Sequence, residues 1–308
     1  MRAIGVNVVG GPDALEVLDL PEPHAGPGQI RIRVAAAAVN PTDTMQRSTR
    51  RQQVDPPWVP GMDIAGTVDE IGDGTDELLA VGDRAMAIVV PSGTHGAYAE
   101  YVVVPAGSAV PLPDGVDVVA ASTLPMNAMT ARLALDELAL PSGATIAVSG
   151  AAGAFGGYAV ELAVADGLQV FADAKESDVE LVRSLGAHHV LPRGDGFGEA
   201  VRETLADGVD GLADGSVQGN HLLRAVRDGG RIATVRGYEG PPERGITWHP
   251  VWVRTIAERR DKLDALRALA SRGRLTPRVA GTYPADKAPD AHRALEAGGM
   301  RGRAVLTF

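Results

Sequence analysis

The sequence predicts an α/β protein in which a doubly wound parallel sheet interrupts a β-rich, barrel-like domain. The chain of 308 residues is long enough for two domains. Residues 1–120 carry short alternating runs between Gly and Pro turns, whereas residues 121–255 alternate strand-like with helical segments. The tail, 256–308, returns to mixed helices and strands. We therefore expect the sheet domain to be inserted before the first domain is complete.

In the β-rich part, alternation of apolar and polar residues predicts half-buried strands bounded by turns. These strands are expected at residues 29–40, 63–72, 83–90 and 97–105. The tail should add a helix, a strand, a second helix and a last strand, at residues 260–273, 278–284, 288–299 and 303–308.

In the sheet part, strands alternate with helices at a spacing typical of βαβ units. The expected strands lie at residues 145–150, 168–174, 187–192, 209–214 and 231–237. The expected helices lie at residues 154–166, 177–185 and 197–206.

The composition argues against nucleic acid or an anionic membrane as a partner, because the formal net charge is -10 and no run of Lys or Arg is dense. No apolar stretch reaches the roughly 18 residues of a spanning helix, and the N-terminus turns polar too early for a signal peptide. We therefore expect a cytoplasmic protein. The chain has no Cys, and its seven His show no HxxH or HExxH spacing, so we predict no disulfide and no metal site.

A glycine-rich loop follows the strand that ends near Ser149. It reads Ala151-x-Gly153-x-x-Gly156, with Gly150 in front. A dinucleotide fold needs a sharp turn here, a residue without Cβ at the pyrophosphate, and a small residue where the helix crosses the strand. The pyrophosphate would then meet the backbone N–H groups of the helix start, at Ala154 and Phe155. The alternative is a glycine turn that only packs a helix tightly.

Charged residues end the next two strands. Asp173 lies 20 residues after Gly153, where NAD enzymes place an acid at the adenosine ribose. Lys175 and Arg193 could instead hold the 2′-phosphate of NADPH. The alternative for all three is an ordinary solvated charge at a strand end.

Nearly the whole chain resembles the zinc-free medium-chain dehydrogenase/reductases, and within them the quinone oxidoreductase (zeta-crystallin-like) group. The similarity rests on several segments in the same order as in the family. They are "LPEPHAGPGQIRIRVAAAAVNPTDTMQR", "PWVPGMDIAGTVDEIG", "VGDRAMA", "GAYAEYVVVP", "AASTLPMNAMTARLAL", "GAAGAFGGYAVELA", "LGAHHVL", "GGRIATVRG" and "DAHRALEAGGMRGRAVLTF".

The resemblance implies a GroES-like catalytic domain, a Rossmann domain, NADPH as cofactor with NADH as the alternative, and no zinc. It places Pro125 and Thr130 beside the nicotinamide and Asn40 at the cofactor or substrate. Thr130 could instead bond its own helix, and Asn40 could simply fix the Asn-Pro turn. The other expected cofactor contacts are Ala174, Asp214, Gly237 and Tyr238.

The chain also departs from the family pattern. Phe155 puts a bulky side chain into the glycine loop, and Asp173 is unusual for members that prefer NADPH. Arg193 stands where some relatives have a tyrosine. Residues 48–55, "STRRQQVD", lack the tyrosine that relatives place near the substrate.

Reduction of a quinone or an enal puts negative charge on an oxygen, which a hydrogen-bond donor must meet. The candidate donors are Asn40, Asn127, Tyr98 and Tyr238, and we count Asn40, Thr130 and Tyr98 as candidate catalytic residues. An aromatic cluster would form either a wall for a flat substrate or the interface of a homodimer; its residues are Trp248, His249 and Trp252. His292 and Glu296 lie four apart on a helix and should pair.

The sequence thus predicts an NAD(P)H-dependent oxidoreductase that reduces a small-molecule quinone or α,β-unsaturated carbonyl by direct hydride transfer. One alternative is an enoyl or enone reductase of a natural-product pathway. An alternative of another class is an NADPH-binding protein without turnover.

Overall fold

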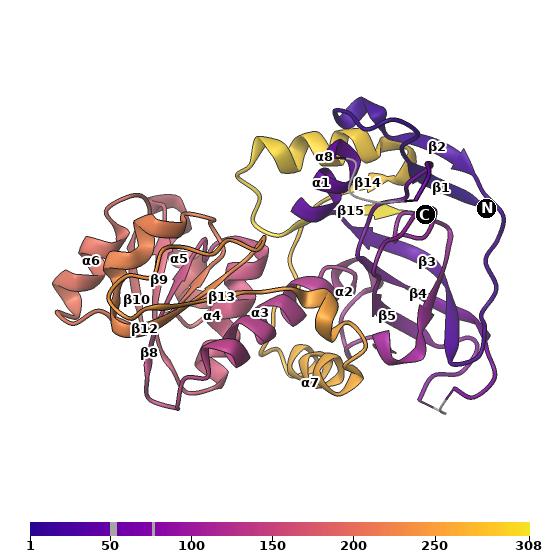
Figure 1. The fold of residues 1–308 in the computed structure, drawn as a ribbon. Helices are drawn as coiled ribbons and strands as arrows, with labels where there is room; N and C mark the ends of the chain where they lie inside the picture. The colour runs from indigo at the N-terminus through magenta and orange to yellow at the C-terminus, as the bar shows by residue number, and fades with distance from the viewer. Residues whose placement is uncertain (50–53, 76–77) are drawn as a thin grey trace. The chain divides into compact units, whose positions relative to one another are not determined.

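The computed structural model forms two compact units (Figure 1) and describes residues 1–49, 54–75 and 78–308. The first unit contains residues 1–126 and 257–308, and the second contains residues 127–256. In Figure 1 the indigo start of the chain and its yellow end belong to the same unit. The second unit is therefore inserted into the first along the sequence.

The first unit is rich in strands. Its strands are β1 (Arg2–Gly5), β2 (Glu16–Asp19), β3 (Gln29–Ala38), β4 (Asp63–Ile71), β5 (Arg84–Ile88), β6 (Tyr101–Pro105), β7 (Ala109–Pro111), β14 (Val279–Pro284) and β15 (Arg303–Thr307). Strands β1 and β2 form an antiparallel pair. The other seven form one sheet in the order β14-β15-β3-β4-β5-β7, with β6 paired to β3, and all of its pairs except β14–β15 are antiparallel.

The first unit also contains helices between its strands. They are α1 (Pro41–Ser48), α2 (Val118–Ala121), α7 (Arg260–Ser271) and α8 (Ala288–Ala297), and α3 (Pro125–Leu138) begins in this unit. A capping box starts α1, because Asn40 and Asp43 each satisfy a backbone N–H of the other. Pro41 at the first position lacks an N–H that would have no helical partner, which favours a helix start there.

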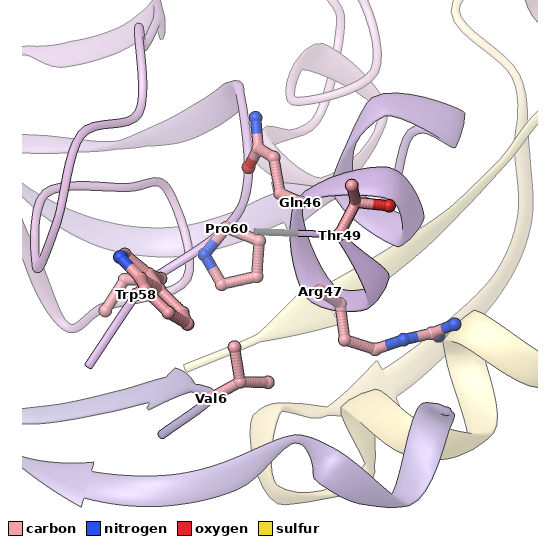
Figure 2. A pocket seen from close by; sticks show the side chains of 7 residues that line it. Val6, Gln46, Arg47, Thr49, Trp58 and Pro60 are labelled. Carbon is pink, nitrogen blue, oxygen red and sulfur yellow. The ribbon is translucent and has the colours of Figure 1, made fainter. Parts of the chain in front are cut away.

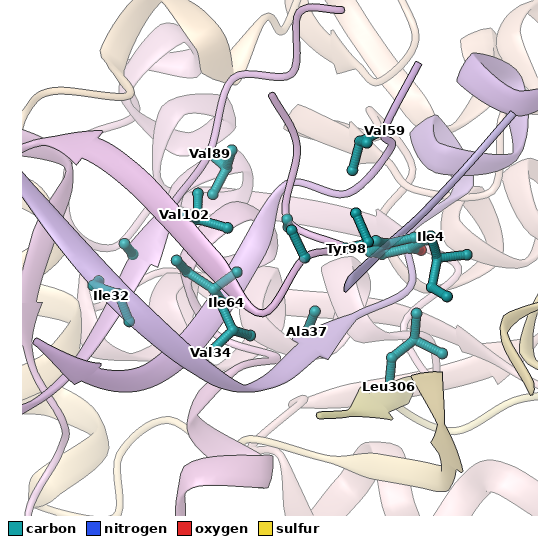
Figure 3. Close-up of a cluster of buried hydrophobic side chains, with 14 of the residues drawn as sticks. Ile4, Ile32, Val34, Ala37, Val59, Ile64, Val89, Tyr98, Val102 and Leu306 are labelled. Carbon is teal, nitrogen blue, oxygen red and sulfur yellow. The ribbon is translucent and has the colours of Figure 1, made fainter. Parts of the chain in front are cut away.

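The core of the first unit lies on one face of the sheet (Figure 3). Along β3 the side chains of Ile30, Ile32 and Val34 are buried, while the alternate residues Arg31 and Arg33 are more exposed. Each large apolar side chain buried in this way stabilises the fold by about 1.5–3 kcal/mol. The alternation that predicted these strands thus also fixes which face packs.

The second unit alternates strands with helices. Its strands are β8 (Thr145–Ser149), β9 (Gln169–Ala174), β10 (His189–Pro192), β11 (Val209–Asp214), β12 (Val226–Thr234) and β13 (Thr247–Pro250). Its helices are most of α3, then α4 (Ala154–Ala165), α5 (Val179–Ser184) and α6 (Phe197–Thr204), with a 3-10 turn η4 (Gly219–Ala225) before β12.

The six strands form a parallel sheet in the order β10-β9-β8-β11-β12-β13. From β8 the chain first adds β9 and β10 on one side and then β11, β12 and β13 on the other. The order therefore reverses between β8 and β11, and ligands of such sheets bind beside the carboxyl ends of the strands at this switch point. The predicted α/β fold class is confirmed.

One expected strand is displaced. We predicted residues 231–237, but β12 begins at Val226 and ends at Thr234. Its end is set by the backbone, because Arg236 and Gly237 have φ of 64° and 72° and cannot continue a strand. Residues 219–230 fall within the predicted alternation of strands and helices, but they form the 3-10 turn η4 and the first part of β12.

Candidate functional site

The glycine loop joins β8 to α4 in the second unit. Its left-handed residue is Gly150, with φ of 70°, so the sharp turn lies one residue before Ala151. This explains why alanine is accepted at position 151. A Cβ on Gly156 would overlap the carbonyl of Gly150, so the helix and the turn are in direct contact there. Gly153 caps α4 in an extended conformation. The loop thus has the close packing that a dinucleotide fold requires.

Helix α4 starts at Ala154 directly after this turn. The first N–H groups of a helix have no acceptor within the helix, and they carry the positive end of its dipole. The backbone N–H groups of Ala154 and Phe155 therefore lie where an anion is stabilised.

The ring of Phe155 packs against the loop that follows β11. A Cβ built on Gly215 would lie 2.6 Å from Cδ1 of Phe155. Phe155 itself is half-buried. The bulky residue in the glycine loop is accommodated because position 215 has no side chain.

Asp173 ends β9 together with Ala174, and both are buried. Its Oδ1 accepts a hydrogen bond of 3.0 Å from the backbone N–H of Ala151. Burial raises the pKa of the Asp173 carboxyl, and the N–H of Ala151 and the charge of Arg193 oppose this. The carboxyl expected at the adenosine ribose is thus directed into the glycine loop.

The two candidate cations at these strand ends are more accessible. Lys175 is exposed directly after β9. The side chain of Arg193, directly after β10, is 37% exposed, and its Nε lies 3.8 Å from Asp173 Oδ2. Strands β9 and β10 are neighbours, so both cations lie at the same edge of the sheet.

Asp214 ends β11 and is 1% exposed. It accepts hydrogen bonds from Ser149 Oγ at 2.7 Å, from the N–H of Ser216 at 3.1 Å and from the N–H of Gly219 at 2.9 Å. The side chain therefore stabilises the loop after β11 rather than pointing outward. Sequence reasoning missed Ser149 and Ser216 because isolated serines carry no spacing signal.

The loop after β12 carries the two remaining expected contacts, Gly237 and Tyr238. Thr234 Oγ1 donates to the carbonyl of Tyr238, whose own hydroxyl donates to Asn220 Oδ1 at 2.6 Å. Tyr238 also meets the Trp248 ring edge to face, with centroids 5.5 Å apart. The hydroxyl considered as a substrate donor is thus engaged within the second unit.

The other members of the aromatic cluster separate. The ring of Trp252 occupies the space that a Cβ on Gly237 would need and remains 46% exposed, with the Arg254 guanidinium 5.2 Å from its centroid. His249 lies on β13, 3.7 Å from Glu137. The described contacts therefore do not join the three side chains into one wall.

Helix α3 contributes three candidates. Pro125 is its first residue, Asn127 is 1% exposed and Thr130 is 9% exposed. All three thus lie within the first two turns of one helix.

Asn40 is fully buried between α1 and β4 in the first unit. Its backbone N–H donates to Asp43 Oδ2 at 2.7 Å, and its Nδ2 donates to Asp63 Oδ2 at 2.6 Å. Asp63 Oδ1 in turn accepts from the N–H of Met126, near the start of α3. Asp63 lies in the quoted segment "PGMDIAG", but sequence reasoning gave it no role.

Burial raises the pKa of both Asp43 and Asp63 to about 7, and the hydrogen bonds from Asn40 and the charge of Arg303 oppose the shift. Two carboxyl groups without solvent thus depend on donors from the surrounding protein for their ionised form.

Tyr98 is fully buried beside this pair. Its hydroxyl lies 3.0 Å from Asp43 Oδ2 and 3.2 Å from His292 Nε2. Arg47 Nη1 lies 3.1 Å from His292 Nδ1. Because a guanidinium only donates, Nδ1 must accept, so Nε2 carries the proton and donates to Tyr98, which donates to Asp43. Tyr98 therefore belongs to an internal chain and is not directed to an open surface.

His292 and Glu296 do not bond each other as expected. Both bind Arg47, whose Nη2 lies 2.5 Å from Glu296 and whose side chain is almost fully buried. Burial, with the positive charge of Arg47, lowers the pKa of His292 to about 3, so the ring is neutral. Instead of pairing with each other, these two side chains on α8 both accept hydrogen bonds from the Arg47 guanidinium of α1.

A small hollow in the first unit lies beside α1 (Figure 2), lined by Val6, Gln46, Arg47, Thr49, Trp58, Val59 and Pro60. Its volume is about 10 Å³, which is room for one water molecule and not for a quinone ring. Of the segment that lacks the family's tyrosine, residues 50–53 lie outside the described residues.

Metal ligands do not cluster in the described part of the chain, since no three His, Asp or Glu there could share an ion. Nor does any helix among the described residues combine the length and apolarity needed to cross a membrane.

Two family models match the chain, one within the first unit and one across the end of the second unit and the C-terminal part of the first. The alcohol dehydrogenase GroES-like domain matches residues 26–114, and the zinc-binding dehydrogenase model matches residues 185–306. The first match agrees with the predicted GroES-like domain.

Individual proteins are similar over nearly the full length. The quinone oxidoreductase of Rattus norvegicus is 30% identical over 99% of this chain and 97% of its own length. The chloroplastic NADPH-dependent alkenal/one oxidoreductase of Arabidopsis thaliana is 29% identical over 99% of this chain and 79% of its own length.

Solved structures agree with the fold. A mycobacterial protein in complex with NADPH is 27% identical with a TM-score of 0.86, and an NAD-dependent alcohol dehydrogenase is 28% identical with a TM-score of 0.88. Each comparison covers 100% of both chains.

A GroES-like unit combined with a dinucleotide-type parallel sheet defines a nicotinamide-dependent oxidoreductase. The chain belongs to the medium-chain dehydrogenase/reductase superfamily, in its quinone oxidoreductase group.

Proposed function

We propose that the protein reduces a quinone or an α,β-unsaturated carbonyl with NADPH, by direct hydride transfer and without zinc. The observation that carries the proposal is the glycine loop, where Gly150 turns the chain and Gly156 brings α4 into contact with the turn. This loop lies at the switch point of the parallel sheet, where a dinucleotide is expected. The similar proteins named quinone oxidoreductase and NADPH-dependent alkenal/one oxidoreductase support the choice of acceptor.

Bound NADPH would supply the hydride, and the tasks left to this chain are binding, orientation and exclusion of water. The N–H groups of Ala154 and Phe155 would bind the pyrophosphate. Asp214 holds the neighbouring loop through Ser216 and Gly219. We assign Pro125 and Thr130 to the nicotinamide end of the cofactor by their family positions. Asn40 has the family position of a cofactor or substrate contact, but its burial and its bonds to Asp43 and Asp63 support the alternative that it fixes the Asn-Pro turn.

The preference for NADPH over NADH rests on Lys175 and Arg193. Both lie at the strand ends on the side of the sheet where the adenosine half of a dinucleotide binds. A guanidinium matches a phosphate with paired donors, and an ammonium adds a point charge. Asp173, the acid at the end of β9, is buried beside Arg193, whereas Glu176 and Asp195 next to the two cations are exposed.

The chemistry of the side chains supports a reaction without zinc. The sequence contains no Cys, and the described residues hold no cluster of His and carboxylates that could replace thiolates. A hydrogen-bond donor of the protein or a water molecule would then have to meet the negative charge that develops on the acceptor oxygen.

Homodimer formation and a cytoplasmic location also stay predictions. The dimer is supported by β13, which is the terminal strand of its sheet and pairs with β12 on one side. Sedimentation or size-exclusion chromatography of the full chain tests it.

The function is tested by mixing the protein with NADPH or NADH and a panel of 1,4-quinones, enals and enones, and following the absorbance of the reduced nicotinamide. We expect oxidation of NADPH with at least one acceptor class. Reduction of enones alone would favour the enone-reductase alternative. Binding of NADPH without turnover would favour the non-enzymatic alternative, and failure to bind either nucleotide would contradict the proposal.

A further inference from the structure

Asp173 does not occupy the position that its place in the sequence suggests. An acid at the end of the second strand of a dinucleotide fold commonly accepts hydrogen bonds from the adenosine ribose. Here the residue is 1% exposed, and its Oδ1 accepts from the backbone N–H of Ala151 at 3.0 Å. The carboxyl therefore faces the pyrophosphate loop from inside the protein.

The second oxygen of Asp173 is also out of reach of a ribose. Oδ2 is buried and has no hydrogen-bond donor among the described residues. Arg193 lies beside it, with Nε 3.8 Å from Oδ2. The negative charge is thus balanced by the loop N–H on one side and by a guanidinium on the other.

A second acid holds the same turn from the opposite strand. Strand β8, which leads into the glycine loop, lies between β9 and β11. Asp214 at the end of β11 accepts from Ser149 Oγ at 2.7 Å, directly before Gly150. Asp173 at the end of β9 binds Ala151, directly after Gly150. The left-handed turn is therefore held between two buried carboxyl groups.

We propose that Asp173 is a positioning residue for the pyrophosphate loop and not a ligand of the adenosine ribose, so that the choice between NADPH and NADH falls to Lys175 and Arg193. The inference rests on the proposed dinucleotide function. It reverses the usual interpretation of an acid at this position, because here the acid does not oppose a 2′-phosphate.

Asp173→Ala and Asp173→Asn separate the two roles. Alanine removes the acceptor for the Ala151 N–H, whereas asparagine keeps one acceptor oxygen. Asp210→Asn is the matched control, since Asp210 accepts from the Thr145 N–H at 2.8 Å at the amino ends of β8 and β11, away from the glycine loop. Dissociation constants for NADPH and NADH are measured by nucleotide fluorescence, and exchange of the Ala151 amide hydrogen is measured without nucleotide.

We expect Asp173→Ala to weaken NADPH and NADH by the same factor, about tenfold, as befits loss of one loop hydrogen bond. The ratio of the two constants should stay within about twofold of the parent, and Asp173→Asn should restore most of the affinity. The Ala151 amide should exchange faster in Asp173→Ala than in Asp173→Asn, and Asp210→Asn should leave both readouts unchanged.

A selective loss of NADH, with the constant for NADPH unchanged, would identify Asp173 as a ribose ligand and overturn the proposal. Equal losses in Asp173→Asn and Asp173→Ala, or in Asp210→Asn, would also overturn it. If the parent protein binds neither nucleotide, the proposed function fails, but the amide exchange still tests the positioning role.

Discussion

Phe155 and Gly215 form a pair of complementary size next to the glycine loop. The Phe155 ring lies where any side chain at position 215 would have to go. The large side chain at position 155 therefore fits because the residue at position 215 is glycine.

We predict that Gly215→Ala destabilises the protein by about 1–3 kcal/mol, because the added methyl group meets both the half-buried Phe155 ring and the carbonyl oxygen of Ser149. The same substitution in a Phe155→Val background should cost less, since the contact with the ring is removed and only the contact of 2.9 Å with the Ser149 carbonyl oxygen remains. Urea unfolding of the two single variants and the double variant gives the coupling. Additive effects would show that the two residues do not share this space.

Lys175 and Arg193 should discriminate between the two coenzymes. Replacing both by alanine is expected to weaken NADPH at least about tenfold more than NADH, because charge-assisted bonds to the 2′-phosphate are lost. Arg183→Ala is a suitable control, since this arginine on α5 pairs with Glu180 and is 60% exposed. Equal losses for both coenzymes in Lys175→Ala with Arg193→Ala would remove these cations from a phosphate site.

At the residue scale, the sequence located the candidate side chains better than it oriented them. The glycine spacing predicted the loop, but the residue with positive φ is Gly150 and not position 151. Asp173 was placed correctly at a strand end, yet its rotamer depends on an N–H of another segment. Such a partner is invisible in the local sequence.

Among the elements, α1 and α8 are linked by a buried hydrogen-bond chain that runs from Arg47 through His292 and Tyr98 to Asp43. Asp43 Oδ2 accepts from both Tyr98 and Asn40, while Oδ1 has no donor among the described residues. Asparagine could therefore replace Asp43 with its oxygen at the Oδ2 position.

We predict that Asp43→Asn gains stability relative to the parent as the pH rises from about 5 to about 7. In the folded parent the pKa of Asp43 is about 7, above the ordinary value of 3.8, so this acid stabilises the fold at low pH and loses that contribution as the pH rises through 7. The variant has no ionisable group at this position and does not lose this stability. Its free energy of unfolding should therefore rise relative to that of the parent by on the order of 2 kcal/mol over this pH range. His292 is present in both proteins, so its contribution to the pH dependence of stability cancels in the comparison.

The measurement is urea unfolding of both proteins at several pH values across that range. A constant difference between parent and variant would contradict the raised pKa. Asp136→Asn on α3 serves as a control, because this residue pairs with Arg132 on a partly exposed face.

Periodicity predicted the longer elements well. Helices α4, α6, α7 and α8 begin at the expected residues, and α8 ends where Gly298 adopts a φ of 73°. The shorter helices α1 and α2 were not expected, since one or two turns are too short to show a helical repeat of apolar residues. Helix α1 depends on its capping box and on Arg47, whose partners lie on α8.

For the whole molecule, the parallel sheet was easier to predict than the antiparallel one. In the second unit, consecutive strands along the chain are mostly neighbours in the sheet. The alternation of strands and helices in the sequence is therefore enough to predict a parallel sheet. In the first unit, β3 pairs with β4, β6 and β15, and the last of these lies at the far end of the chain. Pairing over that separation is decided by packing and not by local pattern.

Direct hydride transfer from NADPH to an electron-poor acceptor is the reaction that we propose for this protein. The most direct test uses NADPH that carries deuterium at C4 of the nicotinamide, with an enone as acceptor, and mass spectrometry or NMR of the product. We predict that deuterium from the transferring face appears on the β-carbon of the reduced enone, with the second hydrogen taken from water. NADPH oxidation that leaves the product free of deuterium in both C4 epimers, or no oxidation with any quinone, enal or enone, would contradict the account.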